Sequence, residues 1–293
     1  MKKLLLLLIV IMSFNISDAQ IKMMFDTEKS EKEKIEGFMS SGYSKIKITR
    51  IDTDEIDWQQ DSALIIYIEV DKKNNVYTEL NYSPQYSKTI IKLDKNINSR
   101  EIFNEKEQSS GKTLYYYNAQ GYLEKRELYF GGLKAFDEIY EYENDKLQKM
   151  KYVMSDGTLV SYSTFKFDDS NNLLKEVKYN SASEIEYQYE YYYDRTLKLS
   201  EENIILGKDN VTVINYSYDK NDRLIQKVTN SKGVQTSIIK FIFQGDNLVE
   251  EIYNTPENKT TKTYTYNNGL LSQIKFLDTI GNSSYIWVYN YIK

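Results

Sequence analysis

The chain has 293 residues, of which 38 are basic and 43 acidic, and it contains neither cysteine nor histidine. These two absences exclude disulfide bonds, a lipid anchor on cysteine, Ser-His-Asp and Cys-His catalysis, and the commonest zinc ligand. No run of basic residues is long enough to follow a phosphate backbone, so we expect no nucleic-acid partner. The 28 tyrosines and two prolines favour β-strands, because tyrosine suits a half-buried pleated surface.

The N-terminus has the pattern of a secretory signal peptide. Two lysines precede an apolar run from Leu4 to Met12, and Ser17 and Ala19 stand three and one residues before the expected cleavage. The apolar run is shorter than the roughly 20 residues that a membrane-spanning helix needs. We therefore predict that residues 1–19 are removed and that the protein is exported, to the periplasm, the cell surface or the extracellular space.

Residues 20–62 differ from the rest of the chain. They contain a helix candidate between Asp26 and Met39, a strand candidate that starts at Tyr43, and an acidic loop with Trp58. Terminal units of repeat proteins are usually atypical because they cover an open end. We expect this segment to form a small N-terminal cap with a short helix.

From residue 63 to the C-terminus the chain repeats a unit of 23 to 26 residues. Each unit has an aromatic-x-aromatic pair, and a leucine follows four to six residues later. The second aromatics are Tyr117, Tyr142, Phe167, Tyr193, Tyr218, Phe243, Tyr266 and Tyr289, and the leucines are Leu123, Leu147, Leu173, Leu199, Leu224, Leu248 and Leu270. Two markers that keep one period indicate a repeat architecture, residues 63–293.

Each unit contains two runs of alternating apolar residues joined by short turns, which predicts two antiparallel strands per repeat. The predicted fold is all-β: a long antiparallel meander of about eighteen strands that curls into an open spiral or shell. A closed barrel is the other physical option, because so long a sheet must twist and curl. Strict alternation in "LLKEVKY" places Leu173 and Lys175 on one face, so we expect a polar stripe along the leucine side.

The unit "YSYDKNDRLIQKVTNSKGVQT", which starts at Tyr216, resembles the YD repeat of the Rhs family, with Tyr-x-Tyr-Asp, a small polar turn, Arg-Leu and a later Gly. The segments "YYYNAQGYLEK", "FKFDDSNNLLKEV" and "YTYNNGLLSQI" are looser copies. In that family the repeats build a curled β-sheet shell and perform no chemistry, and carbohydrate binding is associated with them. The resemblance therefore implies a non-enzymatic scaffold. No variable domain follows the last repeat here, so a toxin is not implied.

One strand is the candidate binding surface. Tyr187, Tyr189, Tyr191 and Tyr193 alternate along "EYQYEYYYD" and share one face. Such a row suits stacking on sugar rings or contact with another protein, each contact being weak and repeated. Packing between strands is the other interpretation. We predict a scaffold that binds a protein or a carbohydrate through its β-sheet surface.

An enzyme is the first alternative. Glycoside hydrolysis requires two carboxyl groups, and the candidates are Asp168, Asp169, Asp194 and Glu190. These acids recur at turn positions, where aspartate bonds its own backbone, so we predict no enzymatic activity. The same turns, Asp168–Asn172 and Asp219–Arg223, are rich in oxygen but lack the EF-hand spacing, so we predict no metal and no cofactor.

An outer-membrane β-barrel is the second alternative, because alternating strands of about ten residues are also its signature. Lysines and glutamates occur on both faces of the predicted strands, as in "LLKEVKY" and "LVEEIY". A charged side chain that faces lipid costs about 2–4 kcal/mol at the bilayer midplane. We therefore expect a chain that does not span a membrane.

Overall fold

The computed structural model describes residues 32–38, 40–52, 62–82, 85–207, 210–278 and 284–293. The predicted signal peptide and Trp58 lie outside these residues. The described chain divides into two compact units, residues 1–110 with 241–293 (unit 1) and residues 111–240 (unit 2). A helix at residues 32–38 lies within the segment where the sequence predicts one. No helix in the described ranges is both long and apolar enough to cross a bilayer.

Twenty strands occur in the described residues, two more than predicted. Unit 1 contains β1 (Lys45–Asp52), β2 (Ser62–Asp71), β3 (Val76–Asn81), β4 (Ser87–Leu93), β5 (Ile97–Phe103), β17 (Asn247–Asn254), β18 (Lys259–Asn267), β19 (Leu270–Asp278) and β20 (Ser284–Ile292). Unit 2 contains β6 (Ser109–Tyr117), β7 (Leu123–Phe130), β8 (Leu133–Glu143), β9 (Lys146–Met154), β10 (Leu159–Phe167), β11 (Leu173–Asn180), β12 (Ile185–Tyr193), β13 (Leu199–Leu206), β14 (Asn210–Tyr218), β15 (Leu224–Ser231) and β16 (Val234–Gln244), apart from two residues of β6 and four of β16.

The strands pair antiparallel with their chain neighbours, as the short turns predict. In unit 2 the pairing runs without interruption from β6 to β16. In unit 1 it runs from β17 to β20, passes to β1, and continues from β2 to β5. The all-β class and the meander are confirmed.

The prediction of an open spiral or shell is wrong, because the first strand pairs with the last. Ile48 of β1 lies opposite Ile66 of β2 on one side and Tyr289 of β20 on the other. All twenty strands belong to one sheet, so the fold is a closed barrel. The physical reason is that the strand near Tyr43 is a full member of the sheet: it pairs on both sides, which leaves no row of unpaired edge groups. Its Ile48 is only 1% exposed.

In most repeats a bulge decides which side chains share a face. Lys166 pairs with Lys175, but the next residue, Phe167, pairs with Leu173, so the return strand holds one extra residue. Phe165 pairs with Glu176, and Leu173 therefore shares its face with Glu176 rather than with Lys175. The same shift occurs at Tyr117, Tyr142, Tyr193, Tyr218 and Tyr266. The expectation that Lys175 shares the face of Leu173 in a polar stripe is wrong, because the bulge turns Lys175 to the opposite face.

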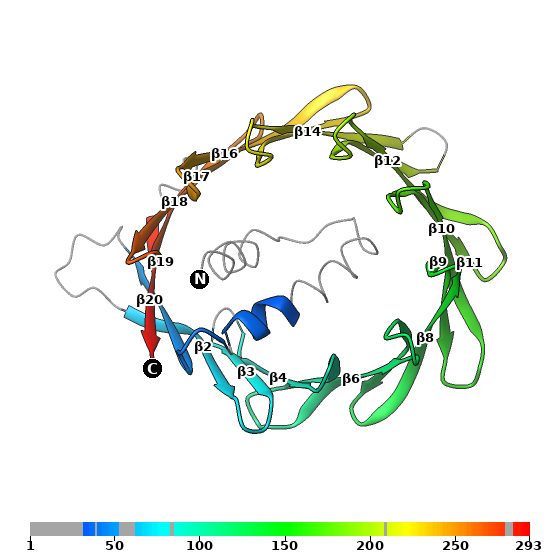
Figure 1. Ribbon diagram of the computed structural model, residues 1–293, viewed down its shortest axis with the longest axis horizontal. Helices are drawn as coiled ribbons and strands as arrows, with labels where there is room; N and C mark the ends of the chain where they lie inside the picture. Colours follow the sequence, from blue (N-terminus) through cyan, green and yellow to red (C-terminus); the bar gives the residue numbers. More distant parts are fainter. Residues whose placement is uncertain (1–31, 39, 53–61, 83–84, 208–209, 279–283) are drawn as a thin grey trace. The chain divides into compact units, whose positions relative to one another are not determined.

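We call the side that carries the repeat leucines the leucine face and its opposite the charged face. In unit 1 the helix packs on the leucine face, next to β2 and β3 (Figure 1). Lys34 of the helix forms an ion pair with Glu79 at 3.7 Å and lies 5.5 Å from the centre of the Tyr77 ring. Ile35 and Phe38 of the helix are 0% and 3% exposed. The helix therefore buries apolar side chains against this part of the sheet.

Candidate functional site

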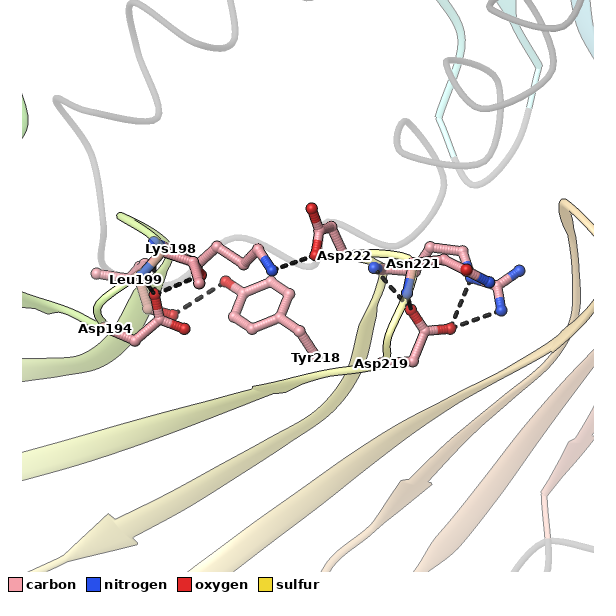
Figure 2. Close-up of polar contacts among 9 residues, drawn as sticks. Asp194, Lys198, Leu199, Tyr218, Asp219, Asn221 and Asp222 are labelled. Carbon is pink, nitrogen blue, oxygen red and sulfur yellow. Dashed lines mark hydrogen bonds and ion pairs between the residues drawn. The ribbon is translucent and has the colours of Figure 1, made fainter.

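In the turn after β14, the acidic residue Asp219 accepts hydrogen bonds from groups of the same turn (Figure 2). One carboxylate oxygen of Asp219 accepts hydrogen bonds from the backbone N–H groups of Asn221 and Arg223, at 2.8 and 3.0 Å. The other oxygen bonds the Arg223 guanidinium at 2.6 Å. The Arg223 guanidinium and two backbone N–H groups thus use both oxygens of the Asp219 carboxylate. This arrangement favours a structural role in the turn over calcium binding. Within the described residues no three acidic side chains gather as a metal-ligand group.

The second aromatic of the repeat bonds the preceding hairpin. The Tyr218 hydroxyl donates a hydrogen bond to the backbone carbonyl of Leu199, at 3.0 Å (Figure 2). The same tyrosine–leucine bond joins Tyr142 to Leu123, Tyr193 to Leu173, Tyr266 to Leu248 and Tyr291 to Leu271. In these hairpins the bond joins a tyrosine of one repeat to a leucine of the preceding repeat. In the last repeat the bonded pair is Tyr291 and Leu271, whereas the sequence pattern selected Tyr289 and Leu270.

Successive turns are also linked by charge. Lys198, in the turn after β12, forms an ion pair with Asp222, in the turn after β14 (Figure 2). Lys146 donates a hydrogen bond to the backbone carbonyl of Asp168, one turn further along, at 2.7 Å. These contacts connect the turns of neighbouring hairpins to each other. The charged side chains of the turns therefore have partners within the protein.

Buried ionisable side chains line the leucine face at a position that the sequence interpretation missed. The third residue after each of the first six repeat leucines is Arg126, Met150, Glu176, Glu202, Lys227 or Glu251, and five of these six are ionisable. Glu176, Glu202 and Glu251 are 1%, 3% and 6% exposed. The signal was available in the repeat alignment, but strict alternation assigned this position to the other face because the bulge was not foreseen.

Glu176 has the most strongly perturbed environment of these acids. Burial raises its pKa to about 7, and the nearby Glu202 charge acts in the same direction. The Ser163 hydroxyl, 3.4 Å away, opposes part of that rise by hydrogen bonding. Glu202 accepts a hydrogen bond from the Tyr216 hydroxyl at 2.7 Å. Burial lowers the pKa of Lys227, whose amine lies 5.3 Å from the centre of the Tyr216 ring. Glu176, Glu202 and Lys227 are thus ionisable side chains of the leucine face that are largely shielded from water.

The predicted binding tyrosines share the leucine face of β12. Tyr189 and Tyr191 are 4% and 3% exposed, and their ring centres are 6.4 Å apart. Tyr187 packs edge-on against Tyr189 at 5.2 Å, and Tyr193 makes the tyrosine–leucine bond. This burial favours the packing interpretation that the sequence left open. Ligand binding by these four rings stays a prediction.

The charged face of unit 2 presents a polar cluster centred on Glu127. Its carboxylate accepts hydrogen bonds from the hydroxyls of Tyr116 and Tyr129, at 2.8 and 2.9 Å, and from the amines of Lys125 and Lys134, at 2.8 and 3.1 Å. The bond from Lys125 is the largest cause that lowers the pKa of Glu127 to about 2. The bond to Glu127 raises the pKa of Tyr116 to about 12. We call these five residues the Glu127 cluster.

Charges continue along the charged face over β9 to β12. Lys175 and Glu190 form an ion pair at 3.5 Å. The Lys149 amine lies 4.2 Å from the centre of the Tyr162 ring, which itself stacks on Tyr179 at 4.8 Å. Aromatic rings beside amines and carboxylates offer stacking and hydrogen bonding together, as protein and carbohydrate recognition require.

The candidate catalytic acids are used locally. Asp168 accepts the backbone N–H of Asn172 at 2.8 Å, and Asp194 accepts that of Thr196 at 2.7 Å. Glu190 pairs with Lys175, and Asp169 belongs to the turn that Asp168 organises. These contacts agree with the turn role expected for the aspartates.

Comparisons with known proteins leave the family open. No protein-family model matches the chain, and no curated protein matches it. One solved structure that it resembles is a porin-like protein from Bacteroides uniformis ATCC 8492, with 12% sequence identity over 86% of this chain and 97% of that chain. The TM-score is 0.38, so the match supports no inference about function.

Proposed function

We propose that this protein is an exported, non-enzymatic β-barrel of the cell envelope that binds a protein or a glycan through its charged face. The observation that carries the proposal is the Glu127 cluster. It combines two tyrosine rings, two amines and a carboxylate on the charged face of neighbouring strands. Repeated clusters of this kind along a sheet give affinity through many weak contacts.

The absence of catalysis is part of the proposal. It is supported by the local use of the turn aspartates and by the burial of Glu176 and Glu202, which keeps these acids from a substrate. It agrees with the YD-like resemblance, which implies a scaffold. The resemblance is itself a proposal, supported by the repeated tyrosine, turn aspartate and leucine.

An outer-membrane barrel is the second candidate, and closure of the sheet favours it. A β-sheet must be closed to span a bilayer, because lipid offers no hydrogen-bond partner to an unpaired strand edge. Closure fits this candidate better than the open scaffold that the sequence predicted. The side chains argue against it: if the leucine face, on which the helix packs in unit 1, is the inner one, Lys125, Lys149 and Lys175 of the charged face would meet lipid. Each costs about 2–4 kcal/mol at midplane.

Binding is tested with the exported chain, residues 20–293, on a glycan array and on envelope proteins. A double variant, Tyr116→Ala with Lys134→Ala, removes a ring and an amine from the Glu127 cluster. We expect a specific ligand whose affinity falls at least about tenfold in the variant, the loss that one to two good contacts represent. Lys220→Ala, in an exposed turn, is the control. Binding that the cluster variant leaves unchanged would refute the role of this face.

The two candidates are separated by extraction of cell membranes with alkaline carbonate. A barrel that spans the bilayer stays in the pellet and requires detergent. A barrel in an aqueous compartment, the outcome we expect, is released by the wash. Retention after the wash would instead support the outer-membrane candidate.

A further inference from the structure

Large apolar side chains are exposed at one end of the strands of unit 2. They are Phe130, Leu133, Met154, Ile185, Leu206 and Val234, which are 54%, 76%, 42%, 58%, 45% and 68% exposed. Each is the first or last residue of its strand: the last of β7, β9 and β13 and the first of β8, β12 and β16. Because these strands alternate in direction, all six lie at the same end of the sheet. We call them the apolar rim.

The opposite end has a different surface. Its turns are organised by Asn118, Asp168, Asp194 and Asp219, whose side chains accept backbone N–H groups. Among the described residues of these turns in unit 2, Leu197 is the large apolar side chain that is exposed, at 57%. The exposed rings nearest to this end, Tyr116 and Tyr192, have hydroxyls bonded to Glu127 and Glu190. Exposed apolar side chains of unit 2 are therefore concentrated at the rim, which has six, whereas the described turns of the opposite end have Leu197.

We propose that the apolar rim rests on a lipid surface and holds the barrel at a membrane without spanning it. The rim residues come from separate hairpins whose strands are spaced by roughly 4.8 Å, so they form a row along the strand ends. Such a row suits a flat apolar partner more than a single peptide or small molecule. The headgroup boundary of a bilayer accepts apolar side chains while the polar backbone of the turns stays hydrated.

Charged side chains next to the rim limit how deeply the rim enters the lipid surface, and their signs determine how binding depends on salt. Lys134 follows Leu133 directly and is paired with Asp137 at 2.8 Å, and the rim turns also carry Asp156 and Lys232. Both signs are present, so the attraction comes from the apolar side chains, and we expect binding to change little with salt. The ion pairs of the charged face begin within one or two residues of the rim and remain in water. This contact requires no ligand at the Glu127 cluster, although Tyr129 and Lys134 of that cluster are the chain neighbours of Phe130 and Leu133.

The test is flotation of the full exported chain with vesicles made of equal parts of phosphatidylethanolamine and phosphatidylglycerol. The rim variant carries Leu133→Asn and Val234→Asn. The matched control, Leu197→Asn, removes an exposed leucine from the opposite end, at a position whose φ of +62° asparagine tolerates, as Asn171 does in another turn. We expect the wild type and the control to float equally, and the rim variant to lose at least about tenfold in partitioning.

Circular dichroism and thermal melting check that the rim variant folds. A second readout does not depend on it: Phe130→Trp should shift its emission to the blue and be quenched by brominated lipid, whereas Leu197→Trp should not. Failure of the wild type to float, equal flotation of the rim variant, or equal quenching of the two tryptophans would overturn the proposal. A dimer that the rim variant abolishes, without flotation of the wild type, would assign the rim to a second copy of the chain.

Discussion

Glu176 is the side chain that we expect to dominate the pH dependence of stability between pH 4.5 and 7. Burial raises its pKa from 4.5 to about 7, and the chain has no histidine to titrate in the same range. The folded state therefore holds the proton more tightly than the unfolded state does. The stabilisation is complete below pH 4.5 and is lost as the pH rises through 7, by about 3 kcal/mol for a shift of this size.

The measurement is urea unfolding of the wild type and of Glu176→Gln across this range. We expect the variant to lose most of the pH dependence and to be the more stable protein at pH 8, because it carries no buried charge there. Glu190→Gln is the control, since Glu190 lies on the charged face with Lys175. The pKa of Glu127 is lowered to about 2, so its titration falls below the window. Wild-type stability that rises between pH 4.5 and 7 would contradict the assignment.

Between neighbouring hairpins, the tyrosine–leucine hydrogen bond connects each such hairpin to the preceding one. We expect Tyr218→Phe to keep the packed ring but to lose the hydrogen bond to the Leu199 carbonyl, which is 3.0 Å long. The loss should be about 1 kcal/mol in the free energy of unfolding, the usual contribution of one hydrogen bond. Urea denaturation gives the value.

The chain supplies its own control for this substitution. Phe167 and Phe243 hold the same repeat position, so a phenyl ring fits there without strain. Phe167→Tyr should therefore gain a bond to the preceding hairpin and raise stability slightly. Tyr192→Phe removes an exposed hydroxyl bonded to Glu190, and it should change stability less than Tyr218→Phe does. Equal effects at Tyr218 and Tyr192 would show that the tyrosine–leucine bond has no special weight.

For the whole molecule, β1 is the strand on which closure depends. It pairs with β2 and β20 at once, and Lys47 at its centre has an exposed side chain. Lys47→Pro removes a backbone donor and clashes with the ladder while sacrificing little packing. We expect a loss of about 3 kcal/mol or more, together with aggregation, because two strand edges become available to other chains. Thermal melting and size-exclusion chromatography measure both effects.

A proline in a turn is the control for closure. Lys220 is the first central residue of the turn from Asp219 to Asp222, a position that suits the fixed φ of proline. Lys220→Pro should leave the melting temperature and the monomer unchanged. If Lys47→Pro behaved in the same way, closure through β1 would not be a source of stability.

How much the sequence predicts depends on the range over which its signals act. Alternation and turn residues are local signals. They correctly predicted two antiparallel strands joined by a short turn in each repeat, as in β14, the turn at Asp219 and β15. The tyrosine row on β12 was also placed on one face, although its burial was not foreseen. The face of Glu176 was missed because one extra residue in a return strand reverses the alternation, and no residue type marks that bulge.

The all-β class, the two-strand repeat and the antiparallel order could be predicted without coordinates, because each follows from contacts between residues close in the chain. Only the tertiary structure decided that the sheet closes and which charges are buried. Closure depends on β1 meeting β20, two strands at opposite ends of the chain, and nothing in the local pattern distinguishes a sheet whose ends meet from one whose ends stay apart. Burial depends on the register between strands, which a bulge resets in most repeats.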